Sequence, residues 1–123
     1  MKKVNAKNAP SAVGAYSQAM ISGGFVFTSG QLGIMENGTL AEGVSAQVAE
    51  ALKNLSNVLT AAGSSMEKVV KTTCYLADIN DFAVFNTIYG NFFSHKPART
   101  LIEAAALPKG ALVEIEAIAE VDN

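Results

Sequence analysis

A permanent cation and two carboxylates lie close together near the carboxyl end of the 123-residue chain. Arg99 stands at the head of one extended run, and Glu114 and Glu116 lie within the next. A guanidinium is a planar donor that binds a carboxylate through two parallel hydrogen bonds. A glutamate whose pKa is raised by partial burial can hold a water molecule and accept its proton. These residue types predict a clamp for a small carboxylic acid beside a group that activates water.

Each of these side chains also has an ordinary structural interpretation. Arg99 could form a surface ion pair with Glu103 or Glu116, and such pairs contribute only about 0–1 kcal/mol. Glu114 could belong to a solvated strand face, and the residue types alone favour these structural interpretations. An unbulged antiparallel hairpin that places Arg99 opposite Glu114 would unite the two side chains, whereas a slip of one residue would separate them. The sequence leaves this register open.

The elements that must position these residues follow from periodicity and turn signals. Apolar residues at helical spacing predict a helix over residues 43–62 and a second helix from 78 or 80 to 93. Alternating or β-branched runs predict strands. The expected strands are 16–21, 25–29, 69–77, 99–105 and 111–121, with a short possible strand over 1–5. The last two are expected to form a hairpin joined by Leu107-Pro108-Lys109-Gly110.

The last strand indicates how the layers are arranged. Its small apolar residues at odd positions from Val113 to Ala119 alternate with Glu114, Glu116 and Glu120 at even positions. Two amphipathic helices can cover one face of such a sheet, which predicts an α+β fold. The charged face must then contact water or another subunit. Half of the residues are hydrophobic, which favours a homo-oligomer.

Composition excludes several other classes of function. A net charge of −2 with no basic block argues against nucleic-acid binding. No apolar run approaches the ~20 residues of a membrane span, and no secretory signal follows the first lysines. Cys74 is the only cysteine, which fits a cytoplasmic protein, and it is expected to be a small buried hydrophobe. No metal spacing, P-loop or dinucleotide motif occurs, and His95 receives no role. The length predicts one domain over 1–123.

Four further residues could contribute to a site. Tyr16, Ser29 and Gly30 lie at expected strand ends, where a hydroxyl or a backbone N–H group could bind an anion. Asn86 lies within the second helix and could point its amide towards a site. Each also has a simpler explanation, because aromatic and glycine residues are common at strand ends and Asn86 could belong to a solvated helix face.

Several motifs together resemble one known family. They are Gly14-Ala15-Tyr16-Ser17-Gln18-Ala19, Thr28-Ser29-Gly30-Gln31, Asp81-Phe82 with Phe85-Asn86, Tyr89 and Phe92-Phe93, and Pro97-Ala98-Arg99-Thr100 with Leu107-Pro108-Lys109-Gly110-Ala111 and Glu114-Ile115-Glu116-Ala117. The set resembles the RidA/YjgF family of reactive imine and enamine deaminases. The match runs from near the amino terminus to the end, and the last block is its most specific part.

The resemblance implies a chorismate-mutase-like fold, a mixed sheet with two helices on one face, and a homotrimer with active sites between subunits. It implies hydrolysis of 2-aminoacrylate and related 2-imino acids to 2-oxo acids and ammonia, without a metal or an organic cofactor. Arg99 would hold the substrate carboxylate, and Glu114 would hold the attacking water. The residues that would line the pocket are Tyr16, Ser29, the Gly30 backbone and Asn86.

Two positions depart from the family pattern. Ala15 stands where a proline is common, so the loop before Tyr16 could be less rigid. Leu101 stands where many members carry a cysteine, which removes a thiol from the site and could alter the size of substrate that is accepted.

Two other functions stay open beside the deaminase. A non-catalytic regulatory trimer could bind small 2-oxo acids in the same pocket. An RNA-acting inhibitor of translation is the third class, which the acidic charge balance disfavours.

Overall fold

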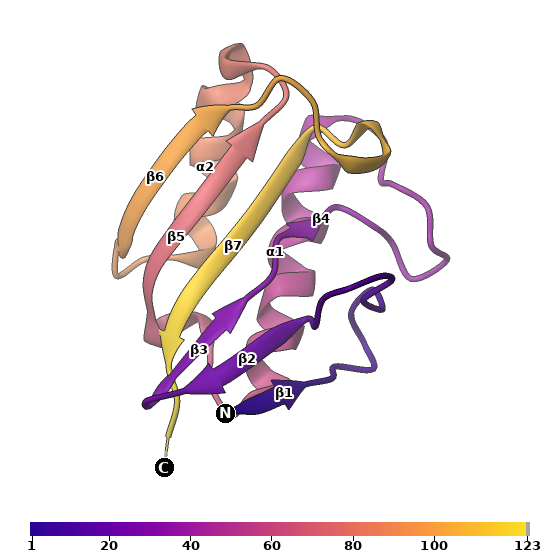
Figure 1. The fold of residues 1–123 in the computed structure, drawn as a ribbon. Helices are drawn as coiled ribbons and strands as arrows, with labels where there is room; N and C mark the ends of the chain where they lie inside the picture. Colours follow the sequence, from indigo (N-terminus) through magenta and orange to yellow (C-terminus); the bar gives the residue numbers. More distant parts are fainter. Residues whose placement is uncertain (123) are drawn as a thin grey trace.

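The computed structural model describes residues 1–122 as a mixed sheet with two helices packed on one of its faces (Figure 1). The strands follow the order β1-β2-β3-β7-β5-β6, and β4 pairs with β7 beside this path. The strands are β1 (Lys2–Val4), β2 (Ala19–Ser22), β3 (Phe25–Thr28), β4 (Gln31–Leu32), β5 (Val69–Leu76), β6 (Ala98–Glu103) and β7 (Val113–Glu120). The helices are α1 (Val44–Ala61) and α2 (Phe82–Phe92). The predicted placement of two helices on one sheet face is confirmed.

The expected hairpin of the last two strands is wrong, because β5 lies between β6 and β7. The helix α2 connects β5 to β6, and a connection of this kind places the two strands side by side in parallel. The chain then crosses the end of β5 to reach its other side. Two backbone hydrogen bonds hold this crossing, from Ala104 N to Leu76 O at 2.8 Å and from Ala77 N to Leu112 O at 3.0 Å.

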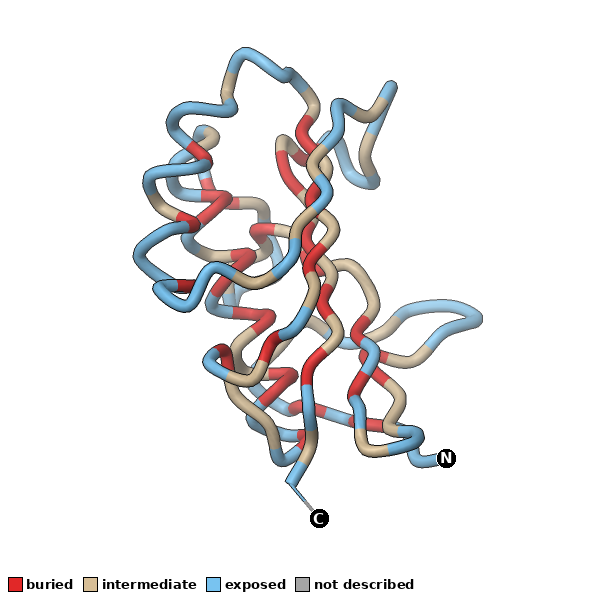
Figure 2. The backbone as a smooth tube through the Cα atoms, turned by 90° about the vertical axis from the view of Figure 1, so that its left-hand side faces the viewer, coloured by how far each residue is buried: buried red, intermediate tan, exposed pale blue. Residues whose placement is uncertain are grey.

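The core lies between the sheet and the helices. Val113, Ile115 and Ala119 of β7 are buried at every second position, as the alternating sequence predicts. Figure 2 shows the buried positions concentrated where the helices face the sheet. The apolar stripe of α1 is fully buried from Val48 to Leu59, Val44 at its start is partly buried, and Gly63 follows this helix with a φ of 80°. Cys74 is also buried among these residues, so its expected role as a small hydrophobe is confirmed.

The second helix faces the sheet through Phe85, Tyr89 and Phe93, which follow one another at intervals of four residues. The sequence spacing predicts an inward stripe of Phe82, Phe85, Ile88 or Tyr89, and Phe92, but Phe82 and Phe92 are exposed. The inward stripe of α2 is therefore rotated from the predicted one.

The structure differs from the expected elements most at the amino-terminal end. The strand expected over 16–21 begins only at Ala19, so Tyr16 lies in a loop. The two-residue strand β4 occupies a stretch where Gly30, Gly33 and the Asn37-Gly38 turn predict irregular structure. The possible strand over 1–5 is present as β1. Within residues 1–122, neither helix combines the length and apolar character that crossing a bilayer requires.

Candidate functional site

Glu114 lies on the sheet face that the helices leave uncovered. It is the second residue of β7, and Leu32 of β4 pairs with it on one side while Tyr75 of β5 pairs with it on the other. Its side chain enters a cleft of about 1240 Å³. We call this the glutamate cleft; its wall includes Tyr16, Ser29, Gly30, Asn54, Glu114 and Glu116.

The electrostatics of the glutamate cleft favour a carboxyl group that titrates closer to neutrality. Burial raises the pKa of Glu114, and the neighbouring carboxylate of Glu116 raises it further. Glu116 accepts a hydrogen bond from the Tyr75 hydroxyl at 3.2 Å. A carboxylate with a raised pKa is a stronger general base, because its conjugate acid holds the proton more tightly. Glu114 is thus suited to accept a proton from water.

The loop that carries Tyr16 is fixed to the wall of the cleft by its neighbours. The Ser29 hydroxyl donates to Ser17 O at 2.5 Å, and Ser29 N donates to Gln18 O at 2.8 Å. The buried Gln18 side chain accepts from Ala6 N and donates to Ala6 O. Tyr16 itself is 54% exposed at the rim. The structure therefore places Tyr16, Ser29 and Gly30 around the same cleft as Glu114.

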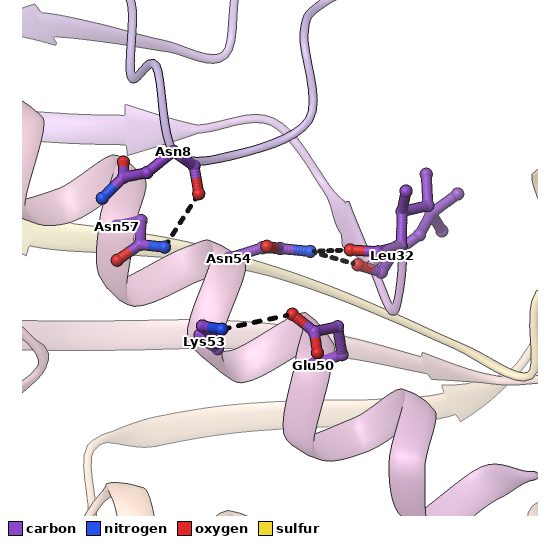
Figure 3. A network of polar contacts seen from close by, with 7 residues as sticks. Asn8, Leu32, Glu50, Lys53, Asn54 and Asn57 are labelled. Carbon is purple, nitrogen blue, oxygen red and sulfur yellow. Dashed lines mark hydrogen bonds and ion pairs between the residues drawn. The ribbon is translucent and has the colours of Figure 1, made fainter. Parts of the chain in front are cut away.

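Four polar residues of α1 also line the cleft, namely Glu50, Lys53, Asn54 and Asn57, and Figure 3 shows their polar contacts. The Asn54 amide donates to Leu32 O at 3.0 Å and to Ile34 O at 2.9 Å. Asn57 donates to Asn8 O at 2.9 Å, and Lys53 lies 4.0 Å from Glu50 at the surface. The helix α1 therefore anchors the segment that contains β4 and also supports the amino-terminal loop.

Arg99 lies on the opposite side of the sheet, where α2 packs. Its guanidinium donates to the Asn86 side-chain oxygen at 2.8 Å. Its Cζ lies 4.9 Å from the ring centre of Tyr89 and 5.6 Å from that of Phe82. The Tyr89 hydroxyl is hydrogen-bonded to the buried Thr72 hydroxyl at 2.7 Å, which fixes the ring beneath the cation.

The surface around this guanidinium is hollowed. The arginine hollow, as we call it, has a volume of about 420 Å³ and is lined by Asn86, Tyr89, Gly90, Phe93, Lys96, Pro97 and Arg99. Asn86 therefore lies with Arg99, apart from Tyr16, Ser29 and Gly30.

The alternative interpretation of Arg99 as one half of a surface ion pair is wrong for the described part of the chain. Among residues 1–122, no carboxylate lies within ion-pair distance of its guanidinium. Glu103 instead accepts from Ile79 N at 2.8 Å, and Glu116 accepts from Tyr75. Asn86 is neutral and uses one of the five guanidinium donors. The positive charge is therefore available to an external anion.

Arg99 and Glu114 do not meet within one chain. Arg99 pairs with Thr72 of β5, whose side chain is buried on the helix side, whereas Glu114 pairs with Tyr75, which points to the other side. Paired residues project to the same face, so Arg99 and Glu114 project to opposite faces. The interpretation in which a hairpin brings Arg99 and Glu114 together within one chain is therefore wrong. The chain instead carries two separate hollows, the glutamate cleft and the arginine hollow.

Sequence reasoning missed the buried amides that hold the cleft in shape. Asn54 is 4% exposed and Gln18 is 3% exposed, and both bond to backbone groups far along the chain. Helical spacing predicts Asn54 on the polar face of α1, with Glu50, Lys53 and Asn57. The available signal was its position among Ala51, Leu52 and Leu55, since an amide inside an apolar stripe needs a buried partner.

Comparison with protein families matches residues 6–121 to the family described as Endoribonuclease L-PSP. A curated 2-iminobutanoate/2-iminopropanoate deaminase of Rattus norvegicus is 48% identical over 121 residues, which are 96% of this chain and 88% of the relative. The namesake proteins of Homo sapiens and Salmonella typhimurium are 46% and 43% identical.

Solved structures share the whole fold. The RidA of an Antarctic Psychrobacter bacterium is 42% identical, with a TM-score of 0.95, over 98% of this chain and 100% of that one. Escherichia coli TdcF, whose structure holds bound serine, is 36% identical, with a TM-score of 0.94, over 99% of this chain and 100% of that one.

Proposed function

The chain belongs to the RidA/YjgF family, whose model is described as Endoribonuclease L-PSP, and from this premise we propose that it hydrolyses reactive 2-imino and enamine acids to 2-oxo acids and ammonia. The observation that carries the proposal is a pair of complementary half-sites. Arg99 offers a cation without a carboxylate partner among residues 1–122, and Glu114 offers a carboxylate with a raised pKa. The names of three relatives describe deaminases of 2-imino acids, which is the substrate class proposed here.

We further propose that an active site forms where the arginine hollow of one subunit meets the glutamate cleft of its neighbour in a homotrimer. The sheet face without helices supports an assembly, because it exposes Phe25, Phe27 and Ile102 by 37%, 44% and 48%. Apolar side chains on a sheet face favour burial against another subunit. Opposite charges on the two half-sites fit such a contact.

In this site Arg99 binds the substrate carboxylate and so fixes the position of C2. Glu114 orients a water molecule and takes one of its protons as the oxygen attacks C2 of the protonated imine. The C=N double bond becomes a single bond in a tetrahedral aminol. Glu114 then gives that proton to the nitrogen, the C–N bond breaks and ammonia leaves, while the hydroxyl proton passes to the Glu114 carboxylate and the C=O double bond of the 2-oxo acid forms. The substrates also hydrolyse unaided, so positioning and one base suffice and no metal or organic cofactor is proposed.

In this scheme the Ser29 hydroxyl can accept a hydrogen bond from the substrate but cannot donate one. Its hydroxyl proton is donated to Ser17 O, so its free lone pairs can accept but its hydroxyl has no second proton to donate. It is therefore suited to the N–H group of the imine and not to the carboxylate. Serine bound to TdcF is a small acid with both an amine and a carboxylate, which supports ligands of this size.

The first test follows ammonia release from a coupled dehydratase that generates 2-aminoacrylate. We expect release to be faster with the wild-type protein than without it, and Arg99→Ala to remove the gain. Arg99→Lys is expected to keep only part of it, because an ammonium cannot form the two parallel bonds. Lys3→Ala, which removes an exposed cation of β1, is the control and should be as active as wild type. A fully active Arg99→Ala would contradict the proposal.

Variants and binding assays of the same kind distinguish the deaminase from two alternative functions. A non-catalytic 2-oxo-acid binder would show no wild-type acceleration, whereas in the deaminase Glu114→Gln should lose turnover and keep 2-oxo-acid binding. The family description names an endoribonuclease, so RNA is the second candidate ligand. An RNA-binding site would give retention that falls steeply with salt, and the net charge of −2 predicts weak, salt-insensitive retention instead.

A further inference from the structure

Gly30 lies so close to the Glu114 side chain that any side chain at position 30 would overlap it. A Cβ built on Gly30 would lie 2.6 Å from Cδ and 2.7 Å from Cγ of Glu114, and it would also overlap the carboxylate oxygen Oε2. Real Cβ atoms essentially never come within 3.0 Å of such neighbours. The φ of Gly30 is not in the left-handed region, so backbone conformation alone does not require a glycine there. The space above its Cα is instead filled by the glutamate side chain.

The backbone beneath that side chain is held in place from α1. Gly30 precedes β4, which has only two residues and pairs with β7 through Gln31 and Leu32. Beyond it, Asn54 bonds the carbonyl groups of Leu32 and Ile34, as Figure 3 shows for Leu32. Gly33 packs directly on α1, because a Cβ there would lie 2.5 Å from Gln47 O. The surface on which the carboxylate rests is therefore anchored to a helix and not to a free loop.

We propose that Gly30 is a positioning residue for Glu114, in that its missing side chain provides the seat in which the catalytic carboxylate rests. This role rests on the proposed function and deepens it. It differs from a backbone contact with substrate, because the N–H group of residue 30 is present in any non-proline variant. A methyl group at this position would push the carboxylate out of its seat and away from the water that it orients.

Gly30→Ala tests the proposal, because the added methyl group meets the movable end of a side chain and not the backbone. We expect the melting temperature to stay within a few degrees of wild type. We expect kcat to fall on the order of a hundredfold, as for a displacement of about 1 Å at a catalytic group, with KM nearly unchanged. Gly33→Ala is the matched contrast: its methyl group meets the α1 backbone, so it should lose stability.

A double-mutant cycle separates positioning from direct contact with substrate. In Glu114→Gln the base is already absent, so adding Gly30→Ala should cause no further loss of kcat. If Gly30 acted on the substrate independently, the two losses would multiply. A multiplicative loss would overturn the proposal.

An NMR titration of the side-chain carboxyl carbons gives a readout that does not depend on turnover. The Glu114 signal, assigned with Glu114→Gln, should titrate at lower pH in Gly30→Ala because the displaced carboxylate is more hydrated. If the wild-type protein proves inactive, this shift still supports the seat while the deaminase assignment fails. The proposal is overturned if Gly30→Ala leaves both kcat and the Glu114 titration unchanged, or if it fails to fold.

Discussion

The surroundings of Glu114 raise its pKa above the ordinary value for a glutamate. Burial raises its pKa first, and the charge of Glu116 raises it second. The two carboxylates stand two residues apart on β7 and so project to the same face. A general base works only when it is deprotonated, so activity should be lost as pH falls through the pKa of Glu114.

Glu116→Gln should shift the acidic limb of the kcat/KM profile to lower pH. The substitution removes a like charge that disfavours ionisation of Glu114, so the pKa of Glu114 falls and the base stays deprotonated in more acidic solution. The amide oxygen can still accept from the Tyr75 hydroxyl, which preserves that contact. The plateau rate is expected to fall slightly, since a weaker base accepts a proton less readily. A pH profile with an unchanged or raised acidic limb would contradict this explanation.

The residue types suggested a chemistry for Arg99 and Glu114, but their roles were assigned only through the family resemblance, and neither type nor spacing placed the two side chains. A guanidinium and a carboxylate can serve as clamp and base wherever they lie, so type predicts chemistry. Their faces depend on which strands are neighbours, and sequence spacing does not contain that information. The close approach of Gly30 to Glu114 is of the same kind, because it depends on β4 lying beside β7.

The strand β4 has only two residues, and both of them line the glutamate cleft. Its two residues cannot form an extensive ladder, so its position depends on side chains from α1. Asn54 provides both hydrogen bonds from one amide nitrogen while 4% exposed. An unsatisfied buried backbone carbonyl is costly, which makes this amide important to stability.

Asn54→Ala should lower the free energy of unfolding by about 1–3 kcal/mol, because it leaves the carbonyl groups of Leu32 and Ile34 without a donor. Amide protons near β4 should also exchange faster than those of the central strands. Asn57→Ala is the control, since Asn57 makes one exposed hydrogen bond to Asn8 and should change stability by no more than about 0.5 kcal/mol. Denaturant unfolding and hydrogen exchange measure both effects. Equal stability losses in the two variants would contradict the anchoring role.

The elements predicted best from sequence were the ones with the strongest periodicity. The helix expected over 43–62 is Val44–Ala61, since its apolar stripe and Gly63 define it locally. The predicted hairpin of the last two strands is wrong because the sequence after β6 is typical of a tight turn, whereas in the structure this loop crosses the end of β5. The strand–helix–strand order of β5, α2 and β6 carried the better signal, because such connections join parallel neighbours.

At the scale of the whole molecule, the sheet separates the two halves of the proposed chemistry. The arginine hollow opens beside α2, whereas Glu114 projects into the glutamate cleft from the sheet face without helices. One described chain therefore cannot hold a substrate between Arg99 and Glu114. In a closed ring of identical subunits, each contact could join the hollow of one subunit to the cleft of the next. The ring would carry as many complete sites as it has subunits.

Two inactive variants should restore activity when they share an assembly. Arg99→Ala keeps its glutamate cleft, and Glu114→Gln keeps its arginine hollow. Random mixing of equal amounts in a trimeric ring gives a complete site at about one contact in four, and every mixed trimer carries one complete site of its three, so we expect the purified mixed assemblies to show about a third of wild-type activity. Co-expression with two different tags and purification on both would isolate the mixed assemblies for the ammonia assay. Arg99→Ala mixed with Arg99→Gln is the control and should stay inactive, because both lack the same half-site. Mixed assemblies without any recovery would mean that neighbouring subunits do not share the site, since a site within one chain could never be repaired by a partner that carries the other substitution.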